Sequence, residues 1–367
     1  MLSNYPKIAI IYLSFHCEPY IDDVISALKK VTYPKDKLEL VIVDNPHPKF
    51  GSSVPFLNEV FSPLIGGSDF PHVTILPQKE NLGFAGGNNV GIKWAMENGF
   101  DYTYIHNNDG FVTVNAFEPL IEAMEKDKNI AIAQSLIMMF PETELINTSG
   151  NAFQYLGIGF CNDFRKRRVD TDLKENKEIT YASGAAMLIR TDLLKEYGLW
   201  DEDYFLYHED IEYSFRLKMA GYKVIVVPDS IFYHKYAFSR NKEKFYFIER
   251  NRYGLMMTFF KIPTLLLFLP MALILEGGLL IFAWKNGWLK EKFLAYKYWF
   301  YPSHWRLWLK KRRYVQNIRK IKDGELLKTV TGKVVFEDKS TDSPLLKNVG
   351  NPLMNAYWQV VKRIIFW

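Results

Sequence analysis

The segment TYASGAAMLIRTDLLKEYGLWDEDYFLYHEDIEYSFRLKMAGYKVIVVPDSIFYHK, residues 180–235, contains the succession of elements that decides the fold. A turn of small residues leads into an apolar strand. The acid pair Glu209 and Asp210 then opens a helix whose apolar residues recur every four positions from Ile211. A second apolar strand follows and ends at His234. A strand, a helix and a strand in this order predict part of an α/β sheet.

The same alternation runs through the preceding residues. Short apolar runs rich in β-branched residues predict strands at Lys7–Leu13, Leu38–Asp44, Val73–Pro77, Tyr102–His106 and Ile130–Leu136. Helical patterns lie between them, at Tyr20–Val31, Gly87–Asn98 and Asn115–Asp127. We therefore expect a Rossmann-like α/β domain over residues 1–253, with a mostly parallel central sheet and helices on both faces.

The composition is that of a globular protein with room for one large domain and an appendage. Hydrophobic residues make up 48% and charged residues 24% of the 367 residues. The two cysteines, Cys17 and Cys161, lack CxxC spacing, which argues against a disulfide framework and a zinc site. The N-terminus lacks the basic and apolar segments of a signal peptide, so we expect the catalytic part in the cytosol.

An apolar segment follows the predicted α/β domain. Residues Ile262–Trp284 contain one charged side chain, Glu276, in 23 positions, which is enough to cross the hydrocarbon core of a bilayer. Pro270, Glu276 and the Gly277–Gly278 pair weaken a simple spanning helix. A helix that lies in the membrane interface fits these breaks equally well. We expect membrane-associated helices over residues 254–323, either spanning or interfacial.

Positive charge is concentrated directly after this apolar segment. Residues 285–322 contain 12 Lys or Arg and one acid, so the rest of the chain carries about −6, the overall +5 less this +11. Five of the nine tryptophans fall in Trp284–Trp308. Aromatic side chains backed by cations are typical of contact with an anionic membrane surface, which we expect at the cytoplasmic face of the plasma membrane. The alternative is a buried apolar hairpin followed by a solvated basic helix.

Two further expectations concern the C-terminal part. The tail, residues 324–367, contains an amphipathic helical pattern over Asn355–Trp367 that suggests a second membrane contact. A nucleic-acid partner is not expected, because the cations adjoin an apolar run and match no known binding motif.

Polar, acidic or glycine-bearing residues follow four of the predicted strands. They are Ser14–Glu18, Asp44–Asn45, Lys79–Asn89 and Asn107–Gly110. Ligands of parallel α/β sheets bind beyond the carboxyl ends of the strands, so these residues are candidates for a binding site. Asp44 could accept hydrogen bonds from a nucleobase or a ribose; the alternative is an acid that only forms the turn before Pro46.

The next two strand ends indicate contacts to phosphate groups. The stretch Asn81–Gly91 is predicted as a glycine-rich loop before a helix, where the backbone can approach an anion, although it matches neither GxGxxG nor a P-loop. Asp109, in the sequence Asn107–Asp109, could hold Mg²⁺ or Mn²⁺ against a diphosphate. His234 could supply a further metal ligand or a phosphate contact. The alternatives are an Asx-rich turn and a structural histidine.

The acid pair Glu209 and Asp210 has two interpretations. Acids in the first turn of a helix are favoured by the helix dipole. A carboxylate held beside a donor site could also act as the general base for an acceptor hydroxyl.

Taken together, these residues resemble the family 2 glycosyltransferases, which are inverting, nucleotide-sugar-dependent enzymes of GT-A fold, and within them the rhamnosyltransferase-like proteins. The resemblance covers roughly residues 5–255. It is carried by VIVDN at Val41–Asn45, ENLGFAGGNNVGI at Glu80–Ile92, NND at Asn107–Asp109, and SGAAMLIR with HEDIEYSFRLKMAGY up to His234.

The resemblance assigns roles to individual residues. Asp210 matches the catalytic base, with Glu209 and Arg216 in the catalytic set, and Asp109 matches the metal-binding acid, with His234 as a further ligand. The donor-binding set is Ser14, Asp44, Asn81, Gly83, Gly87, Asn88, Asn108 and Gly184. Asn107 stands where a DxD motif has its first acid.

The function that follows is transfer of a sugar from a dTDP- or UDP-sugar, rhamnose-like among the options, to a hydroxyl of a lipid-linked saccharide in cell-surface polysaccharide assembly. A divalent metal is the expected cofactor. The rival hypothesis is a non-catalytic nucleotide-sugar-binding or scaffold subunit of a glycan synthase complex.

Overall fold

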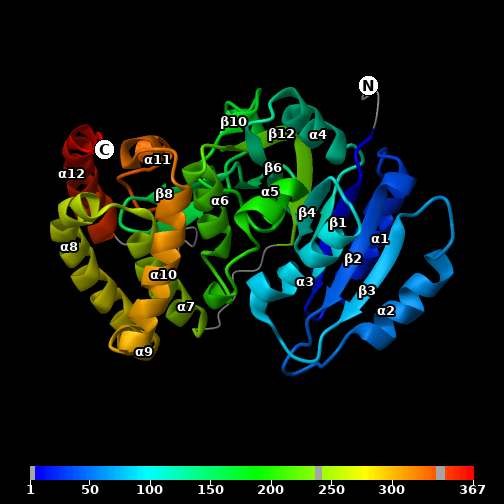
Figure 1. Cartoon of the computed structure of the whole chain (residues 1–367), viewed down its shortest axis with the longest axis horizontal. Coiled ribbons are helices and arrows are strands. Elements are labelled where there is room, and N and C mark those ends of the chain that lie inside the picture. Colours follow the sequence, from blue (N-terminus) through cyan, green and yellow to red (C-terminus); the bar gives the residue numbers. More distant parts are fainter. Residues whose placement is uncertain (1–4, 236–241, 336–343) are drawn as a thin grey trace. The chain divides into compact units, whose positions relative to one another are not determined.

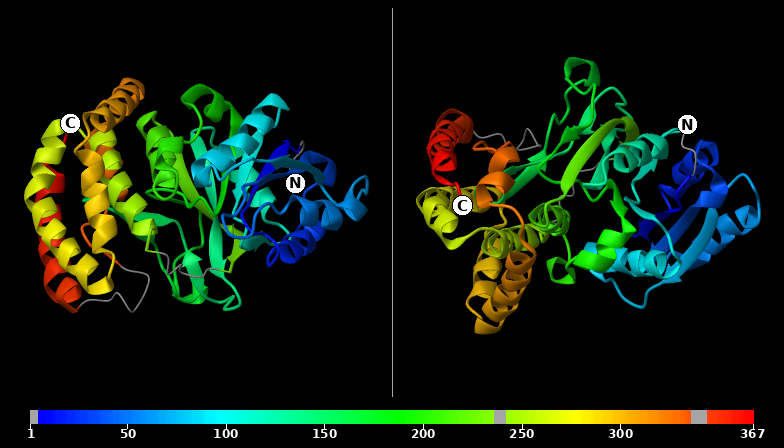
Figure 2. Two further views of the ribbon diagram at one scale, coloured as in Figure 1. Left: turned by 90° about the horizontal axis from the view of Figure 1, so that it is seen from below. Right: turned by 45° about the horizontal axis from the view of Figure 1, so that its top comes forward.

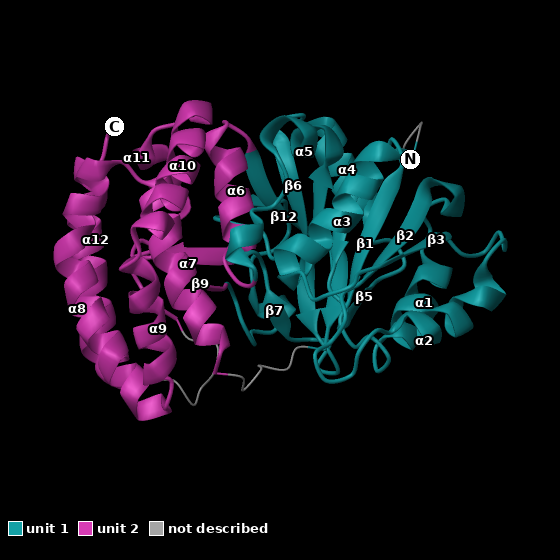
Figure 3. Ribbon diagram, turned by 60° about the horizontal axis from the view of Figure 1, so that its bottom comes forward, with its two compact units in different colours: residues 1–150, 162–205, 223–237 teal, residues 151–161, 206–222, 238–367 magenta. Residues whose placement is uncertain are grey.

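The structure is a computed structural model that describes residues 5–235, 242–335 and 344–367 (Figure 1). The chain divides into two compact units (Figure 3). Unit 1 comprises residues 1–150, 162–205 and 223–237, and unit 2 comprises residues 151–161, 206–222 and 238–367.

Unit 1 contains a ten-stranded sheet. Eight strands follow the order β10-β12-β6-β11-β4-β1-β2-β3, while β5 pairs with β12 and β7 pairs with β6. The strands are β1 (Ile8–Ser14), β2 (Leu38–Asp44), β3 (His72–Pro77), β4 (Tyr102–His106), β5 (Gly110–Val112), β6 (Ile130–Met139), β7 (Ile146–Thr148), β10 (Lys177–Glu178), β11 (Ala186–Arg190) and β12 (Lys223–His234). Every residue of β1, β4, β6 and β11 is buried, which explains their continuous apolar sequences.

The central pairings of this sheet are mostly parallel. β1 is parallel to β2 and to β4, β2 is parallel to β3, and β12 is parallel to β6. β11 runs antiparallel between β4 and β6. The predicted α/β fold with a mostly parallel sheet is therefore confirmed, with one antiparallel strand inserted at its centre.

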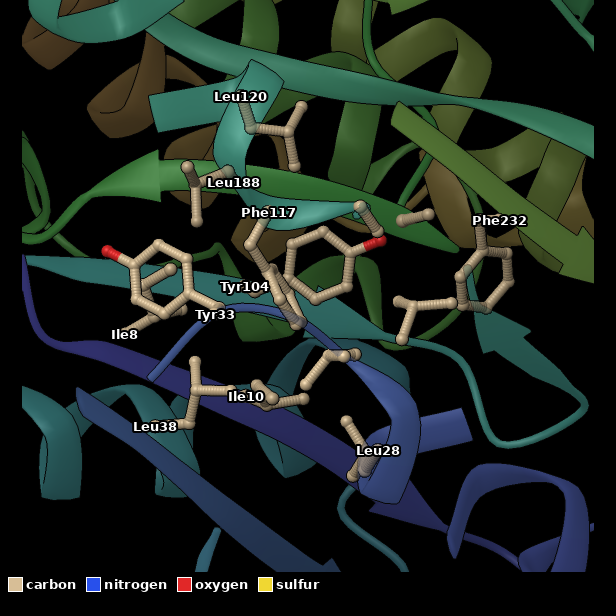
Figure 4. Packing of buried hydrophobic residues seen from close by; sticks show 14 of the residues in the cluster. Ile8, Ile10, Leu28, Tyr33, Leu38, Tyr104, Phe117, Leu120, Leu188 and Phe232 are labelled. Carbon is tan, nitrogen blue, oxygen red and sulfur yellow. The ribbon is translucent and has the colours of Figure 1, made fainter. Parts of the chain in front are cut away.

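Helices cover both faces of the sheet. They are α1 (Ile21–Lys30), α2 (Val54–Phe61), α3 (Gly83–Glu97), α4 (Phe117–Lys126) and α5 (Thr191–Tyr197). On one face, Ile10 of β1 belongs to a buried apolar cluster with Leu28 of α1 and Phe117 of α4 (Figure 4). On the other face, a Cβ added at Gly87 of α3 would lie 2.4 Å from the side chain of Leu13. The glycine thus allows α3 to pack closely on β1.

The prediction of a glycine-rich loop over Asn81–Gly91 is wrong for most of that stretch, because α3 already begins at Gly83. Gly83 has a φ of +73°, and the carbonyl of Phe205 accepts the N–H of Phe84 at 2.7 Å. A protein carbonyl, rather than a phosphate, therefore satisfies a donor at the start of this helix.

Unit 2 combines a short hairpin with helices. The hairpin is β8 (Asn151–Gln154) and β9 (Ile158–Cys161), and the helices are α6 (Glu209–Met219), α7 (Lys244–Phe259), α8 (Ile262–Asn286), α9 (Leu289–Trp299), α10 (Pro302–Ile318), α11 (Asp323–Leu326) and α12 (Asn351–Ile364). Among the described residues, α8 alone is long and apolar enough to cross a membrane, by length and composition only. Its most apolar window has a mean hydropathy of 2.4 and is 22% buried.

Candidate active site

The carboxyl ends of neighbouring parallel strands bring several predicted site residues to one edge of the unit 1 sheet. Ser14 is the register partner of Asp44, and Tyr12 is the register partner of His106. The residues that follow β4, including Asp109, therefore begin at the same edge at which β1 and β2 end.

Asp44 is held by hydroxyl and backbone donors. Its side chain is almost fully buried, with 1% exposed. Oδ2 accepts a hydrogen bond from Ser52 Oγ at 2.6 Å, and Oδ1 accepts the backbone N–H of Ser53 at 3.1 Å and the hydroxyl of Ser14 at 3.4 Å. These contacts fix the carboxylate at the end of β2. Ser52 and Ser53 were not predicted, and no local sequence pattern indicates that they contact Asp44.

Asn45 organises the start of α3. Its Nδ2 donates to Asn81 Oδ1 at 2.8 Å and to the carbonyl of Gly83 at 3.2 Å, and its Oδ1 accepts the N–H of Leu82 at 2.8 Å. Asn81 and Gly83, both predicted donor-binding residues, thus lie beside the end of β2. Asn88 instead donates to the carbonyl of Phe84 at 2.9 Å within α3.

A group of aromatic rings lies beside this strand end. Phe15 and His16 fall in the predicted set Ser14–Glu18, whereas His47 and Phe50 were not predicted. His16 stacks on Phe50 with ring centroids 4.0 Å apart, and His47 lies 4.5 Å from Phe15. His47 Nδ1 accepts the N–H groups of Lys49 and Phe50 at 3.0 and 3.2 Å, and burial with the neighbouring His16 lowers the pKa of the His47 imidazole. The group therefore presents ring surfaces close to Asp44, and the lowered pKa of His47 favours its neutral form.

Asp109 and His234 form the second part of the site. Asp109 Oδ1 lies 2.9 Å from His234 Nε2 and accepts a hydrogen bond from Asn107 Nδ2 at 2.6 Å. The pairing of β12 with β5 makes His234 the register partner of Gly110, which explains how the two residues meet. The His234 side chain is 8% exposed and that of Asp109 25% exposed, so one side of the pair opens to solvent.

Behind Asp109 and His234 lies the buried side chain of His106. His106 Nδ1 contacts the carbonyl of Asn107 at 2.8 Å, and its Nε2 has no hydrogen-bond partner among the described residues. Burial lowers the pKa of His106 to about 4, so the ring is neutral at physiological pH. Asn108 donates to the carbonyl of Phe15 at 3.1 Å and thereby ties the end of β4 to the end of β1.

Asp109 and His234 fit a divalent cation as an open pair of ligands. One carboxylate oxygen and one imidazole nitrogen converge, and Mg²⁺ or Mn²⁺ accepts oxygen donors, with nitrogen tolerated by Mn²⁺. In the described part of the chain, no group of three or more His, Cys, Asp and Glu side chains gathers at one point. A cation at this pair would therefore need oxygen ligands from a bound diphosphate or from water.

Gly184 lies where a side chain would not fit. A Cβ added there would lie 2.9 Å from the ring of Phe84, and Trp200 is 3.5 Å away. Next to it, the backbone N–H of Ser183 donates to Gln134 Oε1 at 2.7 Å. The small-residue turn before β11 therefore packs against the first turn of α3.

The acid pair at the start of α6 belongs to unit 2. Asp210 is half-buried, and its Oδ1 accepts the N–H of Ile211 at 2.8 Å. Glu209 is 5% exposed, and its Oε2 has no hydrogen-bond partner among the described residues. Burial and the neighbouring charge of Asp210 raise the pKa of Glu209 well above its usual value. Glu209 therefore holds its proton more tightly than an ordinary carboxyl does.

Arg216 makes an ion pair within α6. Its Nε and Nη2 donate to the two carboxylate oxygens of Glu212 at 2.9 and 2.5 Å, and its guanidinium lies over the ring of Tyr213. Both charged side chains are buried. These contacts indicate that Arg216 stabilises the helix that carries Asp210.

The fold of the chain is that of a GT-A glycosyltransferase. The solved structure of GalNAc-T7 with UDP, GalNAc and Mn²⁺ superimposes with a TM-score of 0.52 at 16% identity, over 70% of this chain and 48% of that one. A family model described as glycosyltransferase-like family 2 matches residues 6–254, and the chain belongs to this family. The predicted family and the predicted glycosyltransferase class are therefore confirmed.

Two curated relatives match parts of the chain. The low-salt glycan biosynthesis hexosyltransferase of Haloferax volcanii is 22% identical over 148 residues, 39% of this chain and 46% of the relative. The N-acetylglucosaminyl-diphospho-decaprenol L-rhamnosyltransferase of Mycobacterium tuberculosis is 29% identical over 80 residues, 22% of this chain and 25% of the relative. The chain thus matches less than half the length of either relative.

Proposed function

We propose that this glycosyltransferase moves a sugar, with inversion at the anomeric carbon, from a nucleoside-diphosphate donor to a hydroxyl of a lipid-linked saccharide. The observation that carries the proposal is the contact between Asp109 and His234, at the same edge of the sheet at which β2 ends with Asp44. A base-binding acid and a diphosphate-binding pair are the two contacts that a nucleotide sugar needs.

The nucleoside end of the donor is assigned to Asp44 and the aromatic group beside it. The Asp44 carboxylate, held by Ser52 and Ser53, would accept a hydrogen bond from a base N–H or a ribose hydroxyl. The exposed ring of Phe50, stacked on His16, offers a face on which a base can stack.

The diphosphate end is assigned to Asp109 and His234. These two residues would hold Mg²⁺ or Mn²⁺, which when bound supplies positive charge that neutralises the departing nucleoside diphosphate. Support for a metal comes from the ligand pair itself and from a structural neighbour solved with Mn²⁺. Asn107 positions the Asp109 carboxylate through its 2.6 Å hydrogen bond.

Asp210 is assigned as the general base. It would take the proton of the acceptor hydroxyl while that oxygen forms a bond to the anomeric carbon and the bond from this carbon to the diphosphate oxygen breaks. Burial and the charge of Asp210 raise the pKa of Glu209, which favours Asp210 over Glu209 as the proton acceptor. Arg216 would act as a positioning residue through Glu212.

The acceptor class and the location complete the proposal. The name of the Mycobacterium tuberculosis relative includes a diphospho-decaprenol acceptor, which supports a lipid-linked saccharide and a rhamnose-like donor such as a dTDP- or UDP-sugar. The basic, aromatic helices of unit 2 support contact with an anionic membrane at the cytoplasmic face. We likewise assign residues 1–253 to catalysis, 254–323 to membrane association and 324–367 to an amphipathic tail.

The test is a screen of nucleotide sugars for release of nucleoside diphosphate by the full chain, with and without Mn²⁺ or Mg²⁺. We expect release from one donor class, faster with metal and faster again with polyprenyl-diphosphate saccharides. Donor binding without release and without transfer to any of these acceptors would support the scaffold subunit instead.

A further inference from the structure

Unit 2 carries most of the exposed large apolar side chains found in the described residues. Of 25 such side chains, only Phe50, Ile65, Val114 and Val169 belong to unit 1, and the other 21 lie between Ile262 and Phe366. Scattered single apolar side chains are normal on a soluble surface, whereas a concentration of them marks an interaction surface.

The longest part of this surface is one side of α8. Its exposed apolar side chains include Ile262, Leu266, Leu269, Leu273, Ile281 and Trp284. Their separations of three, four or eight residues place them on one side of the helix, over a length of about 33 Å. Gly277 and Gly278, which lie between them, have open space where a Cβ would stand. We call this side the α8 stripe.

The opposite side of α8 is tied to protein along its length. Thr264 donates to Asp323 Oδ2 at 2.6 Å, and the carbonyl of Leu267 accepts a hydrogen bond from Tyr357 of α12 at 2.7 Å. Further along, Phe282 contacts Trp288, with ring centroids 6.0 Å apart. Within the part of the chain that the structure describes, α8 is therefore a surface helix with one protein-facing side and one exposed apolar side.

Glu276 lies on the protein-facing side and is part of a buried ionic cluster. Its Oε2 lies 2.7 Å from Arg252 Nη2, and its Oε1 contacts Lys292. Lys292 also lies 2.5 Å from Glu249, and the side chains of Arg252, Lys292 and Glu249 are no more than 5% exposed. This cluster joins α7, α8 and α9.

This cluster argues against a transmembrane orientation of α8. Glu276 lies about 15 Å from the C-terminal end of the helix, close to the midplane of a hydrocarbon core about 30 Å thick. A spanning α8 would draw Arg252, Lys292 and Glu249 with it to that depth. The exposed Lys290 and Lys297 of α9, which is joined to Glu276 through Lys292, would then face lipid close to that depth, where cations and polar helix ends are not accommodated. An α8 parallel to the membrane plane leaves the cluster on the aqueous side.

α12 packs against the protein-facing side of α8 and has an exposed apolar side of its own. Figure 1 and Figure 2 show the two helices side by side, and the ring of Phe268 on α8 contacts Trp358 on α12. Leu353, Val360 and Ile364 are exposed on α12 at spacings of seven and four residues, so they share one side of it.

Exposed cations accompany this apolar surface in sequence. Lys285 follows Trp284, Arg306 follows Trp305, Lys310 follows Leu309 and Arg363 precedes Ile364, and all of these side chains are exposed. Residues 285–322 carry 12 Lys or Arg against one acid. A second copy of the chain would bring like charges together, whereas anionic phosphate groups complement them.

We propose that α8 lies flat in the interface of a bilayer containing anionic lipid, with the α8 stripe among the acyl chains and the adjoining cations at the phosphates. The proposal selects the interfacial arrangement over the spanning one. It deepens the membrane assignment above and is independent of the transfer chemistry, because vesicle binding is measured without donor or acceptor.

The first test is co-sedimentation of the full chain with phosphatidylcholine vesicles that contain or lack phosphatidylglycerol. Leu266 and Leu273, which are 63% and 65% exposed, are both replaced by Gln. We expect the partition coefficient to fall about 10-fold for each substitution. The matched control, Ile65→Gln with Val169→Gln in unit 1, removes side chains that are 67% and 78% exposed and should leave binding unchanged. Lys285→Gln with Lys310→Gln should weaken binding only to the anionic vesicles.

The second test measures depth. Ile262, Leu273 and Trp284 are replaced one at a time by a spin-labelled Cys, in a Cys161→Ser background that retains the buried Cys17. A flat α8 places the three labels within about 5 Å of one depth, whereas a spanning α8 places the Leu273 label about 15 Å deeper than the others.

Three results would overturn the proposal. The first is a depth profile in which the Leu273 label lies much deeper than the other two. The second is equal vesicle binding by the Leu266→Gln, Leu273→Gln variant and its unit 1 control. The third is a wild-type dimer, detected by light scattering, that these two substitutions dissociate without changing vesicle binding.

Discussion

The imidazole Nε2 of His234 lies 2.9 Å from the carboxylate Oδ1 of Asp109, although 125 residues separate them in sequence. Strand pairing produces this contact, since β12 places His234 opposite Gly110 of β5. The backbone of the sheet, rather than a flexible loop, therefore sets the distance between the two proposed ligands. Such an arrangement holds its geometry before a cation or a diphosphate arrives.

Replacement of Asp109 by Asn should remove the charge that the proposed cation needs. We expect nucleoside-diphosphate release to fall about 100-fold or more, and Mn²⁺ binding, measured by titration calorimetry in the presence of nucleoside diphosphate, to weaken in parallel. Chelation by EDTA should abolish release by the wild type, and added Mn²⁺ should restore it. Undiminished release in EDTA would contradict a metal at Asp109 and His234.

Replacement of Asp210 by Asn should separate catalysis from donor binding. The variant lacks the proposed base, so kcat should fall by about 100-fold to 10,000-fold, while the donor dissociation constant stays within about twofold of the wild type. Asp229→Asn, which changes an exposed acid, is the matched control. An Asp210→Asn enzyme with undiminished transfer would refute the base assignment.

The buried carboxyl of Glu209 should make stability depend on pH. Because burial and the charge of Asp210 raise its pKa, the folded chain binds this proton more tightly than the unfolded chain does. Its contribution to the free energy of unfolding is therefore full below the usual carboxyl pKa and decreases as pH rises. Glu209→Gln removes this term, so its Tm relative to the wild type should increase from about pH 5 to about pH 8.

Thermal unfolding over this pH range checks the Glu209 prediction. Glu175→Gln, at an exposed position, should leave the pH dependence of Tm as it is in the wild type. If Glu209→Gln and Glu175→Gln gave the same dependence, the pKa of Glu209 would not be raised in the folded chain.

Gly87 should be intolerant of even one added methyl group. A Cβ there would lie 2.4 Å from Leu13, so α3 must move away from β1. We expect Gly87→Ala to lower the free energy of unfolding by about 1–3 kcal/mol in denaturant titration. Gly277→Ala is the contrasting variant, because its Cβ meets open space and alanine favours a helix by up to ~1 kcal/mol. If both variants changed the free energy of unfolding by the same amount, close packing of Gly87 on Leu13 would not be needed for stability.

The sheet could be predicted from sequence because its signal is local. Continuous β-branched runs such as Leu38–Asp44 are buried on both faces, and the predicted and observed ranges of this strand agree. The start of α3 could not be predicted. Its first N–H groups are satisfied by the carbonyl of Phe205, more than 100 residues away, and no local pattern reports such a partner.

The candidate site could also be predicted only in part. The position of Asp44 and Asp109 at the sheet edge could be predicted, because the carboxyl ends of parallel strands meet there. Ser52 and Ser53, which hold Asp44, come from the following segment, and His106 is hidden inside an apolar strand. Their roles depend on side-chain directions that only the folded chain defines.

The ionic cluster around Glu276 restricts the rotation of α8 about its own axis. A turn of the helix by one residue step, about 100°, would carry this carboxylate away from both Arg252 and Lys292. The same turn would swing the row containing Leu266 and Leu273 inward. The ion pairs of this one acidic residue therefore fix the rotation of the apolar helix about its own axis, and they determine which of its sides is exposed to solvent.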